Sequence, residues 1–495
     1  MFSFFLLSGL FLGWSLGAND AANVYGTAVG TRMIKFRTAA IVCSIFVILG
    51  AVVGGAGPSH TLGKLGAVNA LPGSFTVALA AALTVTWMTR LRLPVSASQA
   101  VVGAIIGWNI FSESTTDLTS LTEIVSSWII CPILAAVFAA VLLKLTQLLL
   151  RGISLHLFRI DAVTRYGLLI VGAFASYSLG ANNIANVMGV FVAAAPFDDL
   201  DVFGVFTLNA AQQLFLIGGI AISVGVFTYS KRVMLTVGND LFRLSPISAL
   251  IVVLSQALVL FLFSSEGLEH WLSSHGLPTL PLVPVSSSQA VIGAVIGIGL
   301  AKGGRNIRLG VLGNVFWGWV STPIVTAILS FVLLFFVQNV FSQKVFSPVL
   351  YELSPAVAAK LEDEGLFEKP LAGLVGQRFE SGVAFRDAVE PLLSSEESVS
   401  AILEISRVLP LQVDLARIHM LLRRGWLADE RATALGRLQG QRFRHSWQLD
   451  DALAELSEQW RPKPATIQNK PFNKDLRARL EPLHRSFAVD LPAAQ

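Results

Sequence analysis

One acidic residue lies well inside an apolar stretch of this sequence, and amide side chains surround it. Asp20 belongs to the segment GANDAAN (17–23), which recurs as GANNIAN (180–186). A charged side chain in lipid costs about 2.5 to 3.5 kcal/mol on insertion scales, so its presence needs a reason. A carboxylate among amide oxygens suits a hard monovalent cation such as Na⁺, and it can also hold a proton. The candidate cation ligands are Asn19, Asp20, Asn23, Asn182, Asn183 and Asn186.

Amide side chains also have a simpler use in membrane proteins, because they hydrogen-bond neighbouring helices together. That use accounts well for any single asparagine here. It accounts less well for a duplicated set that contains one acid, so we favour ion binding for the set.

A second duplicated segment has the opposite charge preference. PVSASQAVVGAIIG (94–107) recurs as PVSSSQAVIGAVIG (284–297), with 11 of 14 positions identical. Proline and a capping serine are typical of a helix start, where free backbone N–H groups and the helix dipole attract an anion. The plain alternative is a helix break with a cap. The candidate anion ligands are Ser96, Ser98, Gln99, Ser286, Ser288 and Gln289.

Neither of these segments contains lysine or arginine. An anion would therefore be held by dipoles and hydrogen bonds, with co-bound cations offsetting its charge. This arrangement couples the movement of the two ions, because an anion alone would be too costly in a low-dielectric cavity.

A third duplicated feature is a tryptophan followed by a proline. Trp128 with Pro132 recurs as Trp319 with Pro323, and we expect the prolines to break two helices. Hydroxyl groups beside the breaks could bind a cation or satisfy the backbone freed by proline. The further cation candidates are Ser127 and Thr322.

Other familiar site chemistry is not indicated. None of the seven histidines falls at the centre of an apolar span, which argues against a histidine proton relay or metal site. Cys43 and Cys131 lie in apolar runs, so neither a disulfide framework nor a cysteine zinc site is expected. The sequence predicts no cofactor.

Composition places these motifs in a membrane. Hydrophobic residues make up 54% of the 495 residues and charged residues 14%, with a mean hydropathy of +0.66. A soluble protein of this size cannot bury so much apolar surface. The net charge of +4 fits basic loops at a bilayer surface and not a nucleic-acid footprint. We expect the apolar start of the chain to be a retained first span and not a cleaved signal.

Charge density divides the chain. Residues 1–342 contain 27 charged residues and residues 343–495 contain 41. We expect membrane repeat 1 at 1–150, a linker at 151–165, membrane repeat 2 at 166–342 and a soluble helical domain at 343–495. The tail has apolar residues at helical spacing, and we expect a loose, proline-rich segment after Trp460.

Apolar stretches long enough to span a bilayer set the predicted helices. They lie near 3–29, 38–57, 74–90, 120–150, 166–195, 204–228, 245–263 and 309–341, with shorter segments near 94–110 and 284–300. The shorter segments resemble half-helices or hairpin arms.

The loops indicate that the two repeats are inverted. A basic loop follows the first span (Arg32, Lys35, Arg37), whereas the matching loop of the second copy is acidic (Asp198, Asp199, Asp201). Positive charge favours the cytoplasmic side, so matching loops lie on opposite sides. Ten crossings would place both termini outside; a turn at Pro323 would instead leave the tail in the cytoplasm. The predicted fold is an all-α polytopic membrane protein with two inverted repeats and a soluble helical tail.

These motifs resemble those of the inorganic phosphate transporter (PiT) family, over about residues 1–342. The resemblance implies a symporter of phosphate with Na⁺ or H⁺. It implies that the residues of GANDAAN and GANNIAN carry cations and that the serines and glutamines of the two PVS segments hold phosphate. The family usually has GAND in both copies, so Asn183 removes one negative ligand. The pairs Ser98-Gln99 and Ser288-Gln289 also differ from the Thr-His pairs of many relatives.

The sequence therefore predicts a secondary active symporter that imports inorganic phosphate by alternating access, with Na⁺ favoured over H⁺. A symporter of sulfate or another tetrahedral oxyanion is an alternative. An uncoupled anion channel is a third reading, although it gains nothing from Asp20. An enzyme is disfavoured, because no nucleophile, base or metal set lies in the bilayer. The expected location is a cell membrane, namely a bacterial inner membrane. The expected partners are lipid, the anion and its cation, with a homo-oligomer left open.

Overall fold

The structure is a computed structural model that divides into two compact units. The first, here called the membrane unit, comprises residues 1–112, 116–269 and 279–347. The second, the tail unit, comprises 113–115, 270–278 and 348–495. The structure describes residues 2–66, 68–90, 95–151, 157–195, 197, 200–202, 206–236, 244–303, 309–393, 395–423, 429–464, 466 and 469–489. Pro94, Asp198 and Asp199, which entered the predictions above, lie outside these ranges.

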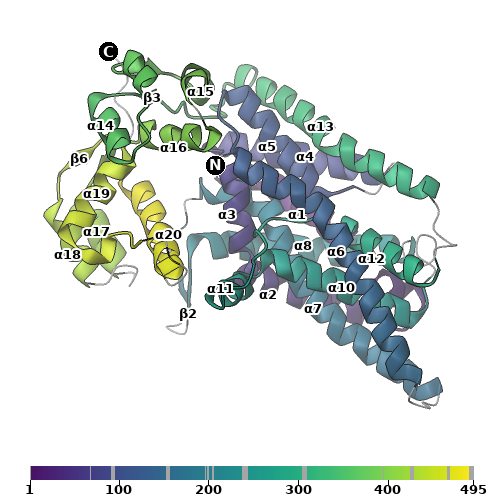
Figure 1. The fold of residues 1–495 in the computed structure, drawn as a ribbon. Coiled ribbons are helices and arrows are strands. Elements are labelled where there is room, and N and C mark those ends of the chain that lie inside the picture. Colours follow the sequence, from purple (N-terminus) through teal and green to yellow (C-terminus); the bar gives the residue numbers. More distant parts are fainter. Residues whose placement is uncertain are drawn as a thin grey trace. The chain divides into compact units, whose positions relative to one another are not determined.

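Helices long and apolar enough to cross a bilayer make up most of the membrane unit (Figure 1). All eight predicted long spans are found. They are α1 (Phe2–Gly30), α2 (Phe36–Gly54), α4 (Leu71–Arg90), α6 (Leu118–Arg151), α7 (Leu157–Val192), α8 (Ala210–Thr228), α10 (Pro246–Ser264) and α13 (Leu309–Asn339). The two shorter apolar segments form α5 (Ala97–Ser112) and α12 (Ser287–Ala301). The chain is an all-α polytopic membrane protein.

Shorter elements connect these helices, and the hydropathy pattern did not predict them. They are α3 (Ala56–Leu65), α9 (Ser230–Thr236), α11 (Glu266–Ser274) and an antiparallel hairpin of β1 (Leu200–Val202) with β2 (Phe206–Leu208).

The surface of α6 shows where lipid covers the membrane unit. Ile129, Ile133, Val137, Val141 and Leu145 are all exposed and recur every four residues. That spacing places them in one stripe along the helix. An exposed aliphatic stripe of this length is typical of a helix face in contact with acyl chains.

The expectation that proline breaks two helices is wrong. α6 continues through Pro132 and α13 continues through Pro323. Proline removes one backbone donor, but a membrane helix tolerates this where neighbouring helices and local hydroxyl groups compensate. The suggested turn of the chain at Pro323 is therefore excluded.

Glycine contacts show that the two repeats pair with each other symmetrically. A Cβ added at Gly17 in α1 would fall on the carbonyl oxygen of Ile222 in α8. In the same way, a Cβ at Gly180 in α7 would fall on the carbonyl oxygen of Val47 in α2. Gly17 and Gly180 are equivalent positions of the duplicated motif. Glycine thus lets helix backbones touch at matching places in both repeats.

The same reciprocity holds around the prolines. Gly103 in α5 packs against the backbone of Pro323 in α13, and Gly293 in α12 packs against the backbone of Pro132 in α6. Each of these pairs takes one helix from each repeat. The repeats are therefore interlocked, and neither is a separate bundle.

The course of α1 against α7 shows that the repeats are inverted. Near the start of α1, Gly9 lies against the ring of Phe191. Near its end, Tyr25 lies against Gly172. Residue numbers rise along α1 while those of its neighbours on α7 fall, so the equivalent helices run antiparallel. This confirms the inversion predicted from loop charge.

The glycine contacts predict a sharp difference between two alanine substitutions. Gly17→Ala should destabilise the protein by about 1 to 3 kcal/mol or more, because backbone atoms of α8 occupy the space of the new methyl group. Gly63→Ala in α3 meets nothing within 4 Å and should be neutral or slightly stabilising. Melting temperatures of the two purified variants test this. Equal melting temperatures would contradict the close packing of α1 on α8.

The tail unit is mainly helical, as predicted, but it also contains two small antiparallel sheets. β3 (Tyr351–Glu352) pairs with β4 (Arg378–Phe379), and β5 (Leu411–Gln412) pairs with β6 (Arg442–Phe443). Its α-helices are α14 (Pro355–Asp363), α15 (Gly382–Val389), α16 (Glu396–Ser406), α17 (Leu415–Arg423), α18 (Asp429–Arg437), α19 (Ser446–Leu456) and α20 (Lys470–Phe487). Short 3₁₀ helices span Lys369–Leu374, Glu390–Leu392 and Glu458–Trp460. The predicted loose segment after Trp460 is wrong in part, because α20 occupies 18 of its residues.

The tail unit is itself duplicated. The sequence Gly-Gln-Arg-Phe occurs at 376–379 and again at 440–443, each time in a small sheet. In the first copy Gly376 N–H donates to the carbonyl of Leu353 at 2.7 Å; in the second Gly440 N–H donates to that of Val413 at 2.9 Å. Each copy has its own apolar cluster.

A lysine links the two copies. Lys360 of α14 lies 2.8 Å from the carboxylate of Asp451 in α19 and 3.3 Å from that of Glu364. Partial burial alone would lower the pKa of Lys360, but the two carboxylates outweigh this effect and raise it.

Candidate functional site

Both PVS segments start helices in the predicted way. The backbone N–H of Gln99 donates to the Ser96 hydroxyl at 3.3 Å, and that of Gln289 donates to the Ser286 hydroxyl, also at 3.3 Å. The two serines are therefore equivalent N-caps of α5 and α12. Capping uses the third N–H of each helix and leaves the earlier ones, with the positive end of the dipole, for a ligand.

Asp20 is the centre of the amide cluster. Among the described residues of the membrane unit, it is the only charged side chain that is buried. Asn183 donates to its Oδ2 at 2.7 Å, and Asn19 donates to its Oδ1 at 3.3 Å. Asp20 and Asn183 are equivalent residues of the two repeats, so the duplicated motifs meet face to face.

The amide cluster and the helix starts form one hydrogen-bonded network. Asn186 donates to the Ser98 hydroxyl at 3.1 Å, and Ser98 in turn donates to the carbonyl of Val285 at 3.1 Å. Val285 directly precedes the cap of α12. The predicted cation and anion residues are thus neighbours, and not two separate sites.

Asn182 has a different part in this network. Its amide nitrogen donates to the carbonyl of Val285 at 2.7 Å, and its oxygen accepts the N–H of Val285 at 2.8 Å. Both ends of the side chain are therefore engaged by backbone. This geometry favours holding the segment before α12 in place over cation binding.

Ser287 is a site residue that the sequence comparison missed. Its hydroxyl lies beside Asp20 and accepts from Asn23 at 3.3 Å, and it is the first residue of α12. The equivalent position in the other repeat is Ala97. Comparing the repeats drew attention to identical positions, whereas this contact depends on one of the three positions that differ.

Several polar atoms at equivalent places are buried and have no hydrogen-bond partner among the described residues. The amide oxygens of Gln99 and Gln289 are one such pair, and the indole N–H groups of Trp128 and Trp319 are another. A primary amide can present its nitrogen or its oxygen, so the glutamines can serve either ion. Ser288, the remaining anion candidate, is half-buried.

The two further cation candidates donate within their own helices. The Ser127 hydroxyl donates to the carbonyl of Ile124 at 2.6 Å, and that of Thr322 donates to Gly318 at 2.5 Å. Neither acceptor is the carbonyl that the following proline frees. Both side chains are buried, and among the described residues neither shares a hydrogen bond with the Asp20 network.

Comparison with known proteins identifies the family. The model of the phosphate transporter family matches residues 16–330 and also 275–403. The chain belongs to the phosphate transporter family. The resemblance inferred from the duplicated motifs is therefore confirmed, and members of this family are transporters.

Individual relatives in this family differ in the anion that they are named for. A protein of Methanocaldococcus jannaschii named as a phosphate permease is 30% identical over 329 residues, which cover 66% of this chain and 95% of the relative. The sulfate permease CysP of Bacillus subtilis is also 30% identical, over 334 residues, 66% of this chain and 86% of the relative.

A solved structure supports the fold. The protein named as the sodium-dependent phosphate transporter matches 68% of this chain and 99% of its own, with a TM-score of 0.53 and 24% identity. This likeness concerns the arrangement of the membrane helices.

Proposed function

We propose that this protein is a secondary active symporter in the cell membrane, namely a bacterial inner membrane, that imports inorganic phosphate together with Na⁺. One observation carries the proposal. The amide cluster around Asp20, the only buried carboxylate of the described membrane unit, hydrogen-bonds both helix starts: Asn23 donates to Ser287 of α12 and Asn186 donates to Ser98 of α5. A cation held by Asp20 therefore lies next to the helix start that attracts an anion.

The proposed roles follow the two halves of the network. Asp20, with amide oxygens of Asn19, Asn23, Asn183 and Asn186, binds the cation. The hydroxyl groups and first N–H groups of α5 and α12, with Gln99 and Gln289, bind the oxyanion. Neither ion is tolerated alone in this buried place, because each needs the opposite charge nearby. Alternating access then moves both ions together.

The network is asymmetric in a way that favours one cation at this place. Repeat 1 supplies the acid Asp20, and its hydroxyl partner Ser287 comes from repeat 2. The position equivalent to Asp20 in the other repeat is Asn183, and the position equivalent to Ser287 is Ala97. The equivalent place therefore lacks both the acid and the hydroxyl group. A second, symmetric cation site would need both.

Sulfate transport is the second candidate. A relative named as a sulfate permease is as similar in identity as one named as a phosphate permease. Dipoles and hydroxyl donors suit any tetrahedral oxyanion. We favour phosphate because the matching family model is that of phosphate transporters.

Uptake into vesicles of purified, reconstituted protein tests the function. Labelled phosphate should accumulate when an inward Na⁺ gradient is imposed and should not respond to excess sulfate. Accumulation driven by a proton gradient alone would assign H⁺ as the coupling ion. Phosphate flux independent of both gradients would indicate a channel, and absence of phosphate uptake with sulfate uptake would establish the alternative.

Ser287→Ala should weaken cation binding specifically. It removes a hydroxyl group beside the Asp20 carboxylate, to which Asn23 donates, so the Na⁺ concentration for half-maximal uptake should rise about tenfold. Ser255→Ala is a matched control, because that buried serine donates only to the carbonyl of Ile251 in its own helix. An unchanged Na⁺ dependence with a raised KM for phosphate would instead assign Ser287 to the anion.

A further inference from the structure

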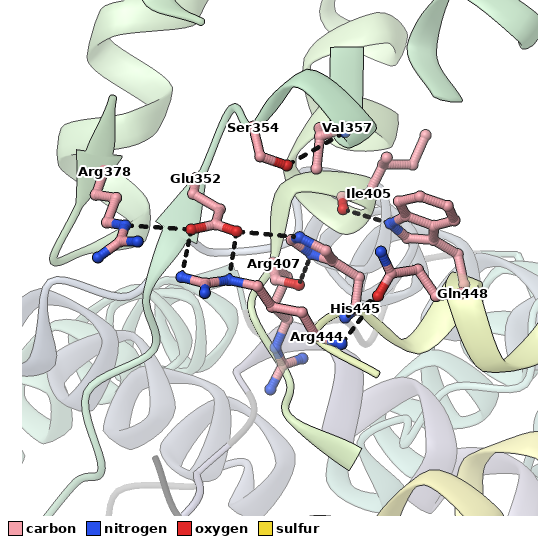
Figure 2. Close-up of polar contacts among 10 residues, drawn as sticks. Glu352, Ser354, Val357, Arg378, Ile405, Arg407, Arg444, His445 and Gln448 are labelled. Atoms are coloured by element: carbon pink, nitrogen blue, oxygen red, sulfur yellow. Dashed lines mark hydrogen bonds and ion pairs between the residues drawn. The ribbon is translucent and has the colours of Figure 1, made fainter. Parts of the chain in front are cut away.

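The tail unit contains a polar pocket of about 350 Å³ where its two repeated copies meet. The lining comes from β3, the start of α14 and residues 376–378 at β4 in the first copy, and from the residues between β6 and α19 and the start of α19 in the second. Figure 2 shows four of the side chains that line it, which are Glu352, Arg378, Arg444 and His445.

One buried carboxylate holds two arginines in this pocket. Only 6% of the Glu352 side chain is exposed. Arg444 approaches it through two nitrogens, with Nε 2.5 Å from Oε1 and a terminal nitrogen 2.6 Å from Oε2. Arg378 approaches Oε2 through its Nε at 3.3 Å. Two guanidinium charges against one carboxylate leave the pocket positive.

The arginines keep donors available for a ligand. The ion pair of Arg378 with Glu352 runs through Nε, as the dashed line in Figure 2 shows, and not through the terminal nitrogens. Its side chain is 69% exposed and that of Arg444 is 46% exposed. Glu352 therefore acts as an anchor that orients both guanidinium groups.

A buried histidine supplies a second, independent observation. The His445 side chain is 1% exposed, and its Nδ1 lies 2.8 Å from the carbonyl of Arg407, to which it donates. Its Nε2 is buried and makes no hydrogen bond to any described residue, although Glu352 Oε1 lies 3.4 Å away. The residues that begin α14 also line the pocket, and that end of a helix favours negative charge.

We propose that this pocket binds an anion that carries a phosphate group. Terminal nitrogens of Arg378 and Arg444 hold its oxygens in the planar geometry that guanidinium groups offer. A doubly charged group offsets the positive excess of the pocket, and the volume leaves room for an organic substituent beyond a bare ion. The site belongs to the tail unit and does not depend on the transport function proposed above.

The second copy of the tail offers a matched control. Arg442 occupies the place of Arg378 in the repeated Gly-Gln-Arg-Phe sequence, but Gln412 stands opposite it where the first copy has Glu352. Arg442 therefore lacks the acidic anchor, and we expect no role for it in binding.

Calorimetric titration of the full-length protein in detergent tests the proposal. The probes are inorganic phosphate and adenosine monophosphate, each titrated into wild type, Arg378→Gln, Arg378→Gln/Arg444→Gln and Arg442→Gln. The double variant should bind the preferred probe at least tenfold more weakly, whereas Arg442→Gln should match wild type. Arg378→Gln alone removes one exposed contact, so it keeps the test usable if the double variant does not fold.

The transport site contributes equally to all these titrations, so the difference between variants isolates the tail. Tighter binding of adenosine monophosphate would identify an organic phosphate as the ligand, and equal or tighter binding of inorganic phosphate would identify the bare ion. The proposal would be overturned if wild type, Arg378→Gln and Arg378→Gln/Arg444→Gln gave identical titrations with both probes, whatever the uptake assays show.

Discussion

Asp20→Asn is expected to abolish Na⁺-driven uptake while the protein remains folded. Asp20 is the one buried charge among the described residues of the membrane unit, and Asn183 and Asn19 donate hydrogen bonds to it. Two opposite unit charges 4 Å apart interact by about 4 kcal/mol at an effective dielectric constant of 20. Removing the carboxylate should therefore reduce uptake at limiting Na⁺ at least about 100-fold.

The amide keeps the shape of the side chain, so the fold should survive. Size-exclusion profiles and melting temperatures check this before transport is measured. Asp161→Asn is the matched control, because that exposed acid lies at the start of α7 and pairs only with Arg165 one turn along. Uptake by Asp20→Asn at the wild-type rate would refute the assigned role.

Asn183→Asp should add one cation, or one proton, to the transport cycle. The amide nitrogen of Asn183 lies 2.7 Å from Asp20 Oδ2, so the variant would place two carboxyl groups at hydrogen-bond distance. Two such groups cannot both be ionised unless a cation lies between them. The Hill slope for Na⁺ should increase, or uptake should become dependent on pH.

A mirrored variant provides the control for this experiment. Asp20→Asn/Asn183→Asp/Ala97→Ser moves the acid to the equivalent position of the other repeat and adds a hydroxyl group at the position equivalent to Ser287. It should recover part of the uptake lost in Asp20→Asn, with the Hill slope of wild type. A Hill slope and pH profile unchanged by Asn183→Asp would mean that this residue does not face the cation.

The membrane fold could be predicted from the sequence because the bilayer imposes a length on each helix. Every long apolar stretch became a helix, and loop charge gave the inversion that the antiparallel α1 and α7 show. The network itself was only partly predictable. Asp20 and Asn183 stand out as polar residues in apolar spans. Ser287 looks like an ordinary serine in the sequence, because its partner Asn23 is far away along the chain.

The failures have identifiable physical causes. Pro132 and Pro323 were expected to break helices, but α6 and α13 continue through them, and the prolines pack closely against Gly293 and Gly103 of neighbouring helices. In the tail, water covers the outer face and no fixed helix length applies. Its α20 begins beside a proline, where local composition suggested a loose chain.

The glycine contacts limit how the transporter can open. The backbones of α5 and α13 are in close contact, and so are those of α6 and α12. The two helices of each pair therefore cannot slide along each other without breaking these glycine contacts. Each helix pair should therefore tilt as one rigid body. Because each pair combines one helix from each repeat, any movement of a PVS helix should carry with it the proline-containing helix of the other repeat.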